Sequence, residues 1–539
     1  MEPARKAAKM VGWFDPRVLM RTAIHMTTAN IFGRHSDPRL IEALASQPQG
    51  HFDYAATDGA GVWLDYVADT GDGWNPVHAI ADALARPTLD VAPAGGGAAE
   101  RTRSGQVLMF GGDEVYPWPS REAYAWRTEW PYQDAFEAHG TSPDIFAIPG
   151  NHDWFDSLVA FSRTFCRPER GFAGCRTQQT RSYFALRLPA DWWLVAIDLQ
   201  LGSELDEPQV QYLKRVAAAM EPQAQVILCV PEPQWIFERA YPGHAAYDGN
   251  MLATLAGDIL QRPVRVFLSG DLHHYRRHEN PAGVQKIISG GGGAFLHPTH
   301  APRPRDLPGG FVERAVYPDR TTSRRLAWRN LAFPWLNPHG LVLPAVLYTL
   351  SAWFASASLS PADIETLAGT VAASLTAALR DPVDGLWLLT VIGGFVFFTD
   401  THVRWYRLIG GISHAIAHLA AALALAWLAA MFTTGVLGLG FGTIAQLLIA
   451  GALTFVSGAV VGGVLIGLYL LVSVQLFGRH ANEAFSSLRI EDYKQWLRMH
   501  FALDGTLTLY AIGIDRVSRG RGDRRATPPH LIEKLVLRR

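Results

Sequence analysis

Cysteine is scarce in this chain of 539 residues, which contains three, Cys166, Cys175 and Cys229. This odd number excludes the even-numbered disulfide framework that stabilises small secreted domains. A bridge between Cys166 and Cys175 is conceivable, but free thiols fit a reducing compartment better. The first forty residues also lack the continuous apolar core of a secretory signal. We therefore expect the soluble part of the chain to remain in the cytoplasm.

Net charge is lacking as well, and charge of either sign is absent from two long stretches. Lys plus Arg number 48 and Asp plus Glu number 49, which argues against a dedicated nucleic-acid binder. Asn330 to Ala362 and Leu408 to Gly478 contain no Asp, Glu, Lys or Arg. Uncharged apolar runs of this length can cross the hydrocarbon of a bilayer. We predict four spans, at residues 341–359, 384–401, 409–431 and 455–477, with 433–454 forming a re-entrant segment or lengthening the fourth helix.

Basic clusters predict the orientation of these spans. Several arginines precede the first span, Arg404 and Arg407 separate the second from the third, and a basic tail follows the last. The positive-inside rule places all three clusters in the cytoplasm, which requires an even number of crossings between them. The alternative of five spans would leave the basic tail outside. The expected localisation is thus a multi-pass cell membrane protein whose soluble domain and C-terminus are cytoplasmic.

Four regions follow from this division. They are an N-terminal basic helical segment (1–49), a soluble domain (50–315), a transmembrane domain of about four helices (330–478) and a cytoplasmic C-terminal segment (479–539). In the last of these, residues 481–501 have helical spacing and residues 506–514 alternate as a short strand. Residues 86–105 are rich in Ala, Gly, Pro and Thr and predict a loop.

Polar motifs follow apolar runs at three places in the soluble domain. The motifs are Gly112-Asp113-Glu114-Val115-Tyr116 after 107–110, Gly150-Asn151-His152-Asp153 after 145–148, and Gly270-Asp271-Leu272-His273-His274 after 264–268. We expect each run to be a strand, so that the polar residues gather at the strand ends of one sheet. Asp, Asn and His together suit one or two borderline-hard cations, which activate water and bind phosphoryl oxygens.

The ordered set resembles the calcineurin-like metallophosphoesterase family over roughly residues 50–315. The family signature is an Asp motif, GDxx, GNHD or GNHE, a lone His after a strand, and GHxH. The first motif here is Asp69-Thr70-Gly71-Asp72-Gly73, which follows the predicted strand 62–67 and has Gly71 where many members carry a His ligand. This is similar to the purple acid phosphatase branch, where a Tyr three residues after the Asp of GDxxY replaces that His. Tyr116 stands at this position.

The resemblance implies an α/β fold, a four-layer α/β/β/α sandwich, with a site for two metal ions. The first ion would be held by Asp69, Asp113, Tyr116 and His273, with Asp113 bridging to the second. For Tyr116 the alternative is an ordinary half-buried tyrosine beside a proline. A tyrosinate ligand would suit a ferric ion.

The second metal position departs from the family in two motifs. It would take Asp113 and Asn151, with Asp271 in place of the first His of GHxH and Glu232 where a lone His is expected. Glu232 lies between two prolines, so an exposed rigid turn is the alternative. Oxygen ligands favour Mn, Mg or Ca over Zn. Over both positions we expect two divalent or mixed-valence ions, from among Mn, Fe, Mg and Zn.

The resemblance also implies roles in catalysis. His152 is similar to the family's proton donor to the leaving alkoxide, and Asp153 could orient its ring. Arg276 and Arg277 could bind a phosphate oxygen, although surface charge is the preferred interpretation. Two further assignments complete the set: His274 should be structural on the other strand face, and His297 and His300 are reserve ligands.

The expected function is a membrane-anchored, metal-dependent phosphoric ester hydrolase. Its partners would be a phosphoester substrate, such as a lipid phosphate, and the lipid bilayer, with homo-oligomers through the helices left open. A degenerate fold acting as a membrane receptor or scaffold is the alternative, and a transporter regulated by the soluble domain is a third. His414 and His418 share one face of the third span, where interhelical hydrogen bonding is preferred to a metal, haem or proton path.

Overall fold

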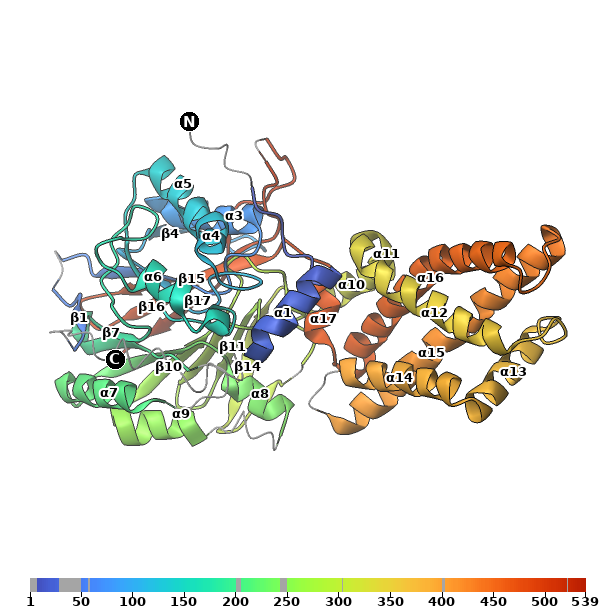
Figure 1. Ribbon diagram of the computed structural model, residues 1–539. Helices are drawn as coiled ribbons and strands as arrows, with labels where there is room; N and C mark the ends of the chain where they lie inside the picture. The colour runs from blue at the N-terminus through green and yellow to red at the C-terminus, as the bar shows by residue number, and fades with distance from the viewer. Residues whose placement is uncertain are drawn as a thin grey trace. The chain divides into compact units, whose positions relative to one another are not determined.

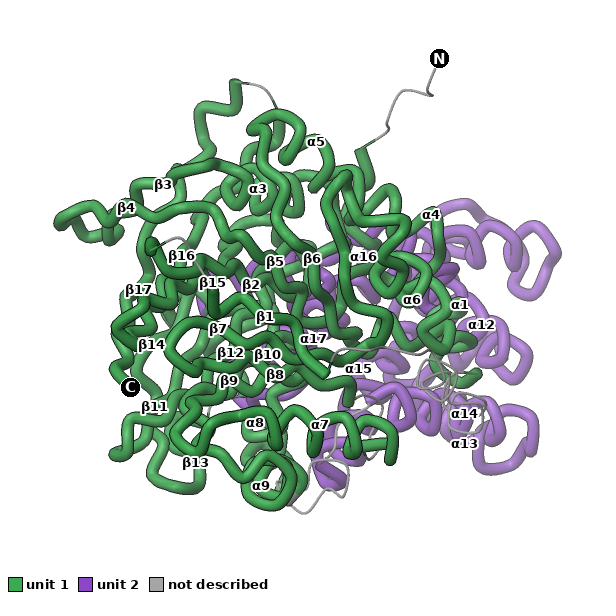
Figure 2. Tube along the Cα trace, turned by 90° about the vertical axis from the view of Figure 1, so that its left-hand side faces the viewer, with its two compact units in different colours: residues 1–11, 20–323, 489–539 green, residues 12–19, 324–488 purple. Residues whose placement is uncertain are grey.

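The computed structural model describes residues 7–28, 50–56, 59–199, 205–242, 250–302, 304–399, 403–520 and 522–539. Most of the predicted basic segment 1–49 lies outside the described residues, although α1 (Pro16–Thr28) within it is helical. The chain divides into two compact units (Figure 2). Unit 1 contains Met1–Val11, Met20–Ser323 and Arg489–Arg539, and unit 2 contains Gly12–Leu19 and Arg324–Leu488.

Unit 1 is built on two large mixed sheets. The loop predicted over 86–105 is wrong in part, because β3 (Thr88–Val91) and β4 (Glu100–Arg103) form a hairpin there. Among the described residues one sheet has nine strands, in the order β1 (Phe52–Asp53), β7 (Phe184–Leu188), β8 (Trp192–Ala196), β9 (Gln225–Val230), β10 (Val264–Ser269), β12 (Gln285–Ser289), β11 (Tyr275–Glu279), β14 (Phe311–Tyr317) and β13 (Asp306–Leu307). The other has six in the described chain, in the order β17 (His530–Leu537), β16 (Leu507–Ile514), β15 (Lys494–Phe501), β2 (Val62–Val67), β5 (Val107–Phe110) and β6 (Asp144–Ala147).

Alternating side chains place a core on each face of the six-stranded sheet. In β2, Leu64 and Tyr66 point into the cluster between the two sheets, whereas Val67 belongs to the cluster on the outer face. Helices α3 (Trp74–Ala85), α5 (Trp130–His139) and α6 (Val159–Phe165) contribute to that outer cluster. Helices α7 (Glu207–Ala219), α8 (Gln234–Ala240) and α9 (Asn250–Thr254) contribute to the cluster on the outer face of the nine-stranded sheet. The result is a layered α/β unit with helices on both outer faces (Figure 1).

The C-terminal strands complete the six-stranded sheet. β15 pairs antiparallel with β2, from Leu497 opposite Tyr66 to Phe501 opposite Val62. The helical spacing predicted for 481–501 is therefore wrong beyond α17 (Ala481–Ser486), because residues 494–501 are a strand, while the strand predicted at 506–514 is confirmed as β16. All of unit 2 except Gly12–Leu19 is thus inserted in the sequence between β14 and β15.

Unit 2 is helical. Its main helices are α11 (Phe333–Leu336), α12 (Val342–Ser358), α13 (Leu367–Arg380), α14 (Pro382–Phe398), α15 (Arg404–Met431), α16 (Ile444–Val472) and α17. By length and composition, three helical segments of the described chain could cross a membrane: Pro338–Ser358, Arg404–Val436 and Ile444–Phe477. α13 and α14 form a pair bent by 103° that would make a fourth span if counted as one. The fourth predicted span begins earlier than expected, because α16 starts at Ile444 and so includes much of the uncharged stretch 433–454.

Candidate metal centre

The motif residues lie at the ends of strands from both sheets, which corrects the expectation of one sheet. Asp69 and Asp113 follow β2 and β5 of the six-stranded sheet, whereas Asp271 follows β10 of the nine-stranded sheet. Each of these three aspartates has a positive φ, of 56°, 56° and 67° respectively. A non-glycine residue adopts this conformation at a cost of order 1–3 kcal/mol, and such residues concentrate at functional sites.

The hydroxyl of Tyr116 is the point at which the first set of predicted ligands meets. It lies 3.2 Å from Asp69 Oδ1, 3.0 Å from Asp113 Oδ2 and 3.1 Å from His273 Nε2. His273 Nε2 is also 3.5 Å from Asp69 Oδ1. Tyr116 is 1 % exposed, so the alternative of a half-buried tyrosine does not hold, and its hydroxyl lies at the centre of the cluster.

The orientation of His273 is set by the loop after β12. Its Nδ1 donates to the carbonyl of Phe295 at 2.7 Å, which leaves Nε2 as the lone-pair nitrogen that faces Tyr116. The same loop is joined to the first motif, because the backbone N–H of Ala294 donates to the carbonyl of Asp69 at 2.8 Å. Gly290 packs so closely on the carboxylate of Asp69 that a Cβ there would overlap Oδ2. The glycine-rich loop thus holds two of the ligands together.

The second set of predicted ligands lies beside the first. Gly150 packs against Asp113 with no room for a Cβ, and this brings the neighbouring Asn151, which is partly buried, into the same group of turns. Burial and, after it, the charge of Asp113 raise the pKa of Glu232 to about 7. Burial followed by the charges of Glu232, Asp69 and Asp113 raises the pKa of Asp271 well above its usual value. These carboxylates are therefore close enough to repel one another.

His152 and Asp153 have different roles in the structure. The backbone N–H of His152 donates to Asp113 Oδ1 at 2.9 Å, and its ring Nδ1 donates to the carbonyl of Pro117 at 2.8 Å. Asp153 accepts from the backbone N–H groups of Asp113, at 3.0 Å, and of Gly150, at 2.8 Å, and from the hydroxyl of Tyr124. Pro117, rather than Asp153, holds the His152 ring at Nδ1, and Asp153 ties the two motif turns together.

A buried lysine from the basic tail lies near this cluster. Lys494, the first residue of β15, is 0 % exposed, and its Nζ donates to the carbonyl of Ala294. Burial lowers its pKa to about 8, while the charges of Asp492, Asp72 and Asp69 favour its protonated form. Lys494 lies outside the three motifs, and the pairing of β15 with β16 and with β2 brings it here.

The remaining candidates make other contacts in the structure. Arg276 is 0 % exposed and donates to the carbonyl of Thr299 at 2.9 Å, and Arg277 forms two 2.8 Å hydrogen bonds with Glu533, so neither is surface charge. Three histidines complete the set: His274 is buried, His297 stacks on His273 with ring centroids 3.9 Å apart, and His300 Nδ1 lies 2.8 Å from Ser323 Oγ.

The chemistry of the first set fits a cation, although its arrangement is that of a hydrogen-bonded cluster. Within the described residues, no group of three or more His, Cys, Asp or Glu side chains is arranged so that it could hold a metal ion. The phenol of Tyr116 stands at the meeting point and has one proton for three acceptors. Burial raises the pKa of Asp113 to about 8, and the Asp69 charge adds to that effect. A positive ion among these oxygens would compensate for the missing protons and would stabilise the ionised form of Asp113.

Comparison with known proteins gives a likeness to phosphatase structures. No protein-family profile and no curated protein matches the chain. A purple acid phosphatase from yellow lupin (Lupinus luteus) seeds has 12% identity and a TM-score of 0.27, over 44% of this chain and 45% of that one, so less than half of the lupin protein is matched. A dimetal phosphatase from Danio rerio has 14% identity and a TM-score of 0.25, over 45% and 91% of the two chains. A phosphopantetheinyl hydrolase from Mycobacterium tuberculosis has 13% identity and a TM-score of 0.26, over 48% and 98%. At such TM-scores the likeness carries no weight for function.

Proposed function

We propose that unit 1 is a metal-dependent phosphoesterase whose centre lies around Tyr116. The observation that carries the proposal is the meeting of Asp69, Asp113 and His273 within 3.2 Å of one buried hydroxyl. These residues come from three motifs far apart in the sequence. Their order is that of the calcineurin-like metallophosphoesterases, with the Tyr of the purple acid phosphatase branch.

Two cations would be held, the first by Asp69, Asp113, Tyr116 and His273, and the second by Asp113 with Asn151, Glu232 and Asp271. When bound, such a pair supplies a water-derived nucleophile and neutralises charge on the phosphoryl oxygens. The second position has only oxygen ligands, so Mg, Mn or Ca suits it better than Zn.

His152 would donate a proton to the leaving alkoxide. Burial lowers the pKa of His152 to about 4, so its ring is neutral at pH 7 in this state. Because Nδ1 donates to the carbonyl of Pro117, Nε2 is the nitrogen that would carry the proton given to the leaving alkoxide. Asp153 acts on the same step indirectly, because it fixes the backbone of Asp113 and Gly150.

Membrane attachment favours a lipid phosphate or another membrane-associated phosphoester as substrate.

Unit 1 contains β2 before the apolar helices and β15 after them, and the two strands pair. They must therefore lie on one side of any membrane, which requires an even number of crossings. The bent pair α13–α14 would then count as one span and bring the number of crossings to four. The positive-inside rule makes the side that β2 and β15 share cytoplasmic.

Cysteine labelling tests this topology. Single cysteines at Ser360 and Gly438, in a chain whose own cysteines are replaced, should both react with a membrane-impermeant maleimide added outside cells. A cysteine at Ser518, in unit 1, should react only after permeabilisation. Opposite sidedness for Ser360 and Gly438 would contradict four crossings.

The enzyme proposal is tested with Asp113→Asn and His273→Ala, with Asp90→Asn as an exposed carboxylate control. Purified proteins are assayed for bound metal by mass spectrometry and for hydrolysis of aryl phosphomonoesters and diesters. We expect the control to match the wild type, and the two site variants to lose metal and at least a hundredfold in turnover. Wild-type protein that folds but holds no metal would favour the alternative, a phosphoesterase-like fold that acts as a membrane receptor or scaffold. In that case the hydrogen bonds of Tyr116 would be part of the working protein.

A further inference from the structure

Unit 2 contains a chain of hydrogen-bonding side chains among helices that are otherwise apolar. His414 and His418 lie one turn apart on α15, and their Nε2 atoms are 3.0 Å apart. The other ring nitrogen of His418, Nδ1, lies 3.0 Å from the hydroxyl of Tyr348 on α12. His418 is 1 % exposed and Tyr348 is 0 % exposed. A Tyr-His-His chain therefore joins two helices inside the unit.

This chain can hold its protons in two arrangements. In the first, Tyr348 donates to His418 Nδ1 and His418 Nε2 donates to His414. In the second, His414 Nε2 donates to His418, and His418 Nδ1 donates to Tyr348. Both arrangements satisfy the same contacts, because each neutral imidazole has one N–H and one lone-pair nitrogen. From the second arrangement, a proton that enters at His414 Nδ1 sends the Nε2 proton of His414 to His418, the Nδ1 proton of His418 to Tyr348, and the hydroxyl proton of Tyr348 outward. No charge remains behind, the chain is left in the first arrangement, and the second must be restored before the next transfer.

The relay is linked to the end of α16. The ring of His414 stacks on that of Tyr469, with centroids 3.9 Å apart and planes at 8°. The Tyr469 hydroxyl lies 3.2 Å from His480 Nε2, and His480 Nδ1 lies 3.6 Å from Glu483 Oε2. Transfer between Tyr469 and His414 requires a side-chain rotation, since their rings stack rather than hydrogen bond. α14 contributes the ring of Phe395, which contacts both histidines.

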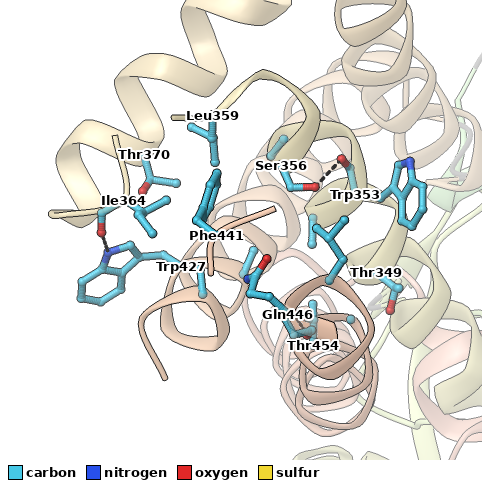
Figure 3. A pocket seen from close by; sticks show the side chains of 17 residues that line it. Thr349, Trp353, Ser356, Leu359, Ile364, Thr370, Trp427, Phe441, Gln446 and Thr454 are labelled. Carbon is cyan, nitrogen blue, oxygen red and sulfur yellow. Dashed lines mark hydrogen bonds between the residues drawn. The ribbon is translucent and has the colours of Figure 1, made fainter. Parts of the chain in front are cut away.

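Unit 2 also contains a cavity of about 60 Å³, lined by residues of α12, α13, α15 and α16 (Figure 3). Its wall includes Thr349, next to Tyr348, and Thr454, one turn before the Gly458 on which the Tyr348 ring packs. Gln446 and Thr370 add further polar atoms to a wall that is otherwise mainly apolar. One water needs about 10–15 Å³ of such volume, so several waters fit. Water in this cavity would be the acceptor for a proton that leaves Tyr348.

A purely structural role explains only part of this arrangement. One Tyr–His hydrogen bond is enough to join α12 to α15, yet a second imidazole faces the first at hydrogen-bond distance. Ionisable side chains are costly in apolar helices and mark ion or proton paths there. We propose that His414, His418 and Tyr348 form a proton relay through unit 2, entered by way of Glu483, His480 and Tyr469 and continued by the cavity. This proposal is independent of the phosphoesterase proposal.

Proton flux into vesicles tests the relay. Full-length protein is reconstituted into potassium-loaded liposomes that contain a pH-sensitive dye, and valinomycin then imposes an inside-negative potential. We expect the lumen to acidify faster with wild-type protein than in empty vesicles. His414→Gln and His418→Gln should slow this at least tenfold, and Tyr348→Phe should slow it similarly because it removes the hydroxyl. His339 lies in the same unit, and its side chain is 79% exposed. His339→Gln is therefore the matched control and should leave the rate unchanged.

Circular dichroism and size-exclusion profiles check that each variant is folded. If His418→Gln does not fold, Tyr348→Phe keeps the test decisive, since it preserves ring volume. Equal rates in wild type, Tyr348→Phe and empty vesicles would overturn the proposal. A stoichiometric transition metal that is lost in His414→Gln but retained in His273→Ala would also overturn it, and would assign the imidazole pair to a metal instead.

Discussion

Replacing Arg498 by Met should strongly destabilise unit 1, because its guanidinium is paired inside the six-stranded sheet. Arg498 is 0 % exposed, and its Nε and Nη2 donate to the two carboxylate oxygens of Asp65 at 2.7 and 2.9 Å. It also donates to Thr102 Oγ1 at 3.1 Å and to the Leu84 carbonyl at 3.2 Å. The substitution leaves a buried carboxylate without its cation. Removing one partner of a buried pair costs about 3–5 kcal/mol.

The chain offers a matched control. Arg101 forms the same two-pronged contact with Asp90, at 2.8 and 3.0 Å, but these side chains are 73% and 53% exposed. Arg101→Met should therefore change the stability of unit 1 little. Thermal unfolding in detergent, followed by tryptophan fluorescence, measures both. At about 2 °C per kcal/mol for a large domain, we expect the Tm of Arg498→Met to fall by roughly 6–10 °C and that of Arg101→Met by at most 2 °C. Equal shifts would refute the pairing of β15 with β2.

Three further predictions concern other parts of unit 1. Burial lowers the pKa of Lys286 from its usual value of 10.5 to about 8. Between pH 8 and pH 10.5, Lys286 is therefore protonated in the unfolded chain and mostly neutral in the folded chain. The free energy of unfolding should rise with pH across that window, and Lys286→Met should abolish this contribution in a pH series of denaturant titrations. A chain ended at Gly478 lacks β15 to β17 and should give a unit 1 that limited proteolysis degrades, whereas the full chain resists. A thiol reagent should modify Cys166, which is partly exposed, before Cys175 and Cys229, which are 3 % and 0 % exposed, and all three should react after unfolding.

The strand ends that carry the site could be predicted from the sequence, because their signal is local. β2 and β5 have the predicted bounds, since each is a short run that is almost wholly buried and ends at a glycine and aspartate turn. Tyr116 and His273 were identified by their position in these motifs, and the structure brings them together.

Residues whose partners lie far along the chain could not be predicted in this way. Arg276 and Arg277 follow the third motif directly, and their roles depend on Glu313 and Glu533 in strands that the sequence does not link to them. Residues 494–501 carry apolar side chains at spacings that also suit a helix. They form a strand because they pair on both sides, with the neighbouring β16 and with the open edge of β2, which lies more than four hundred residues earlier.

The apolar helices lie in the sequence between strands of unit 1, and this order has a consequence for folding. Until residues 494–501 are synthesised, the edge of β2 that will pair with β15 presents unpaired backbone groups, and Asp65 has no guanidinium. If the helices cross a membrane as proposed, the sheet can close only after the last of them has brought the chain back to the side on which β2 lies. An odd number of crossings would therefore separate Arg498 from Asp65 and Lys494 from the glycine-rich loop, so correct insertion of the helices is a condition for assembling the candidate metal centre.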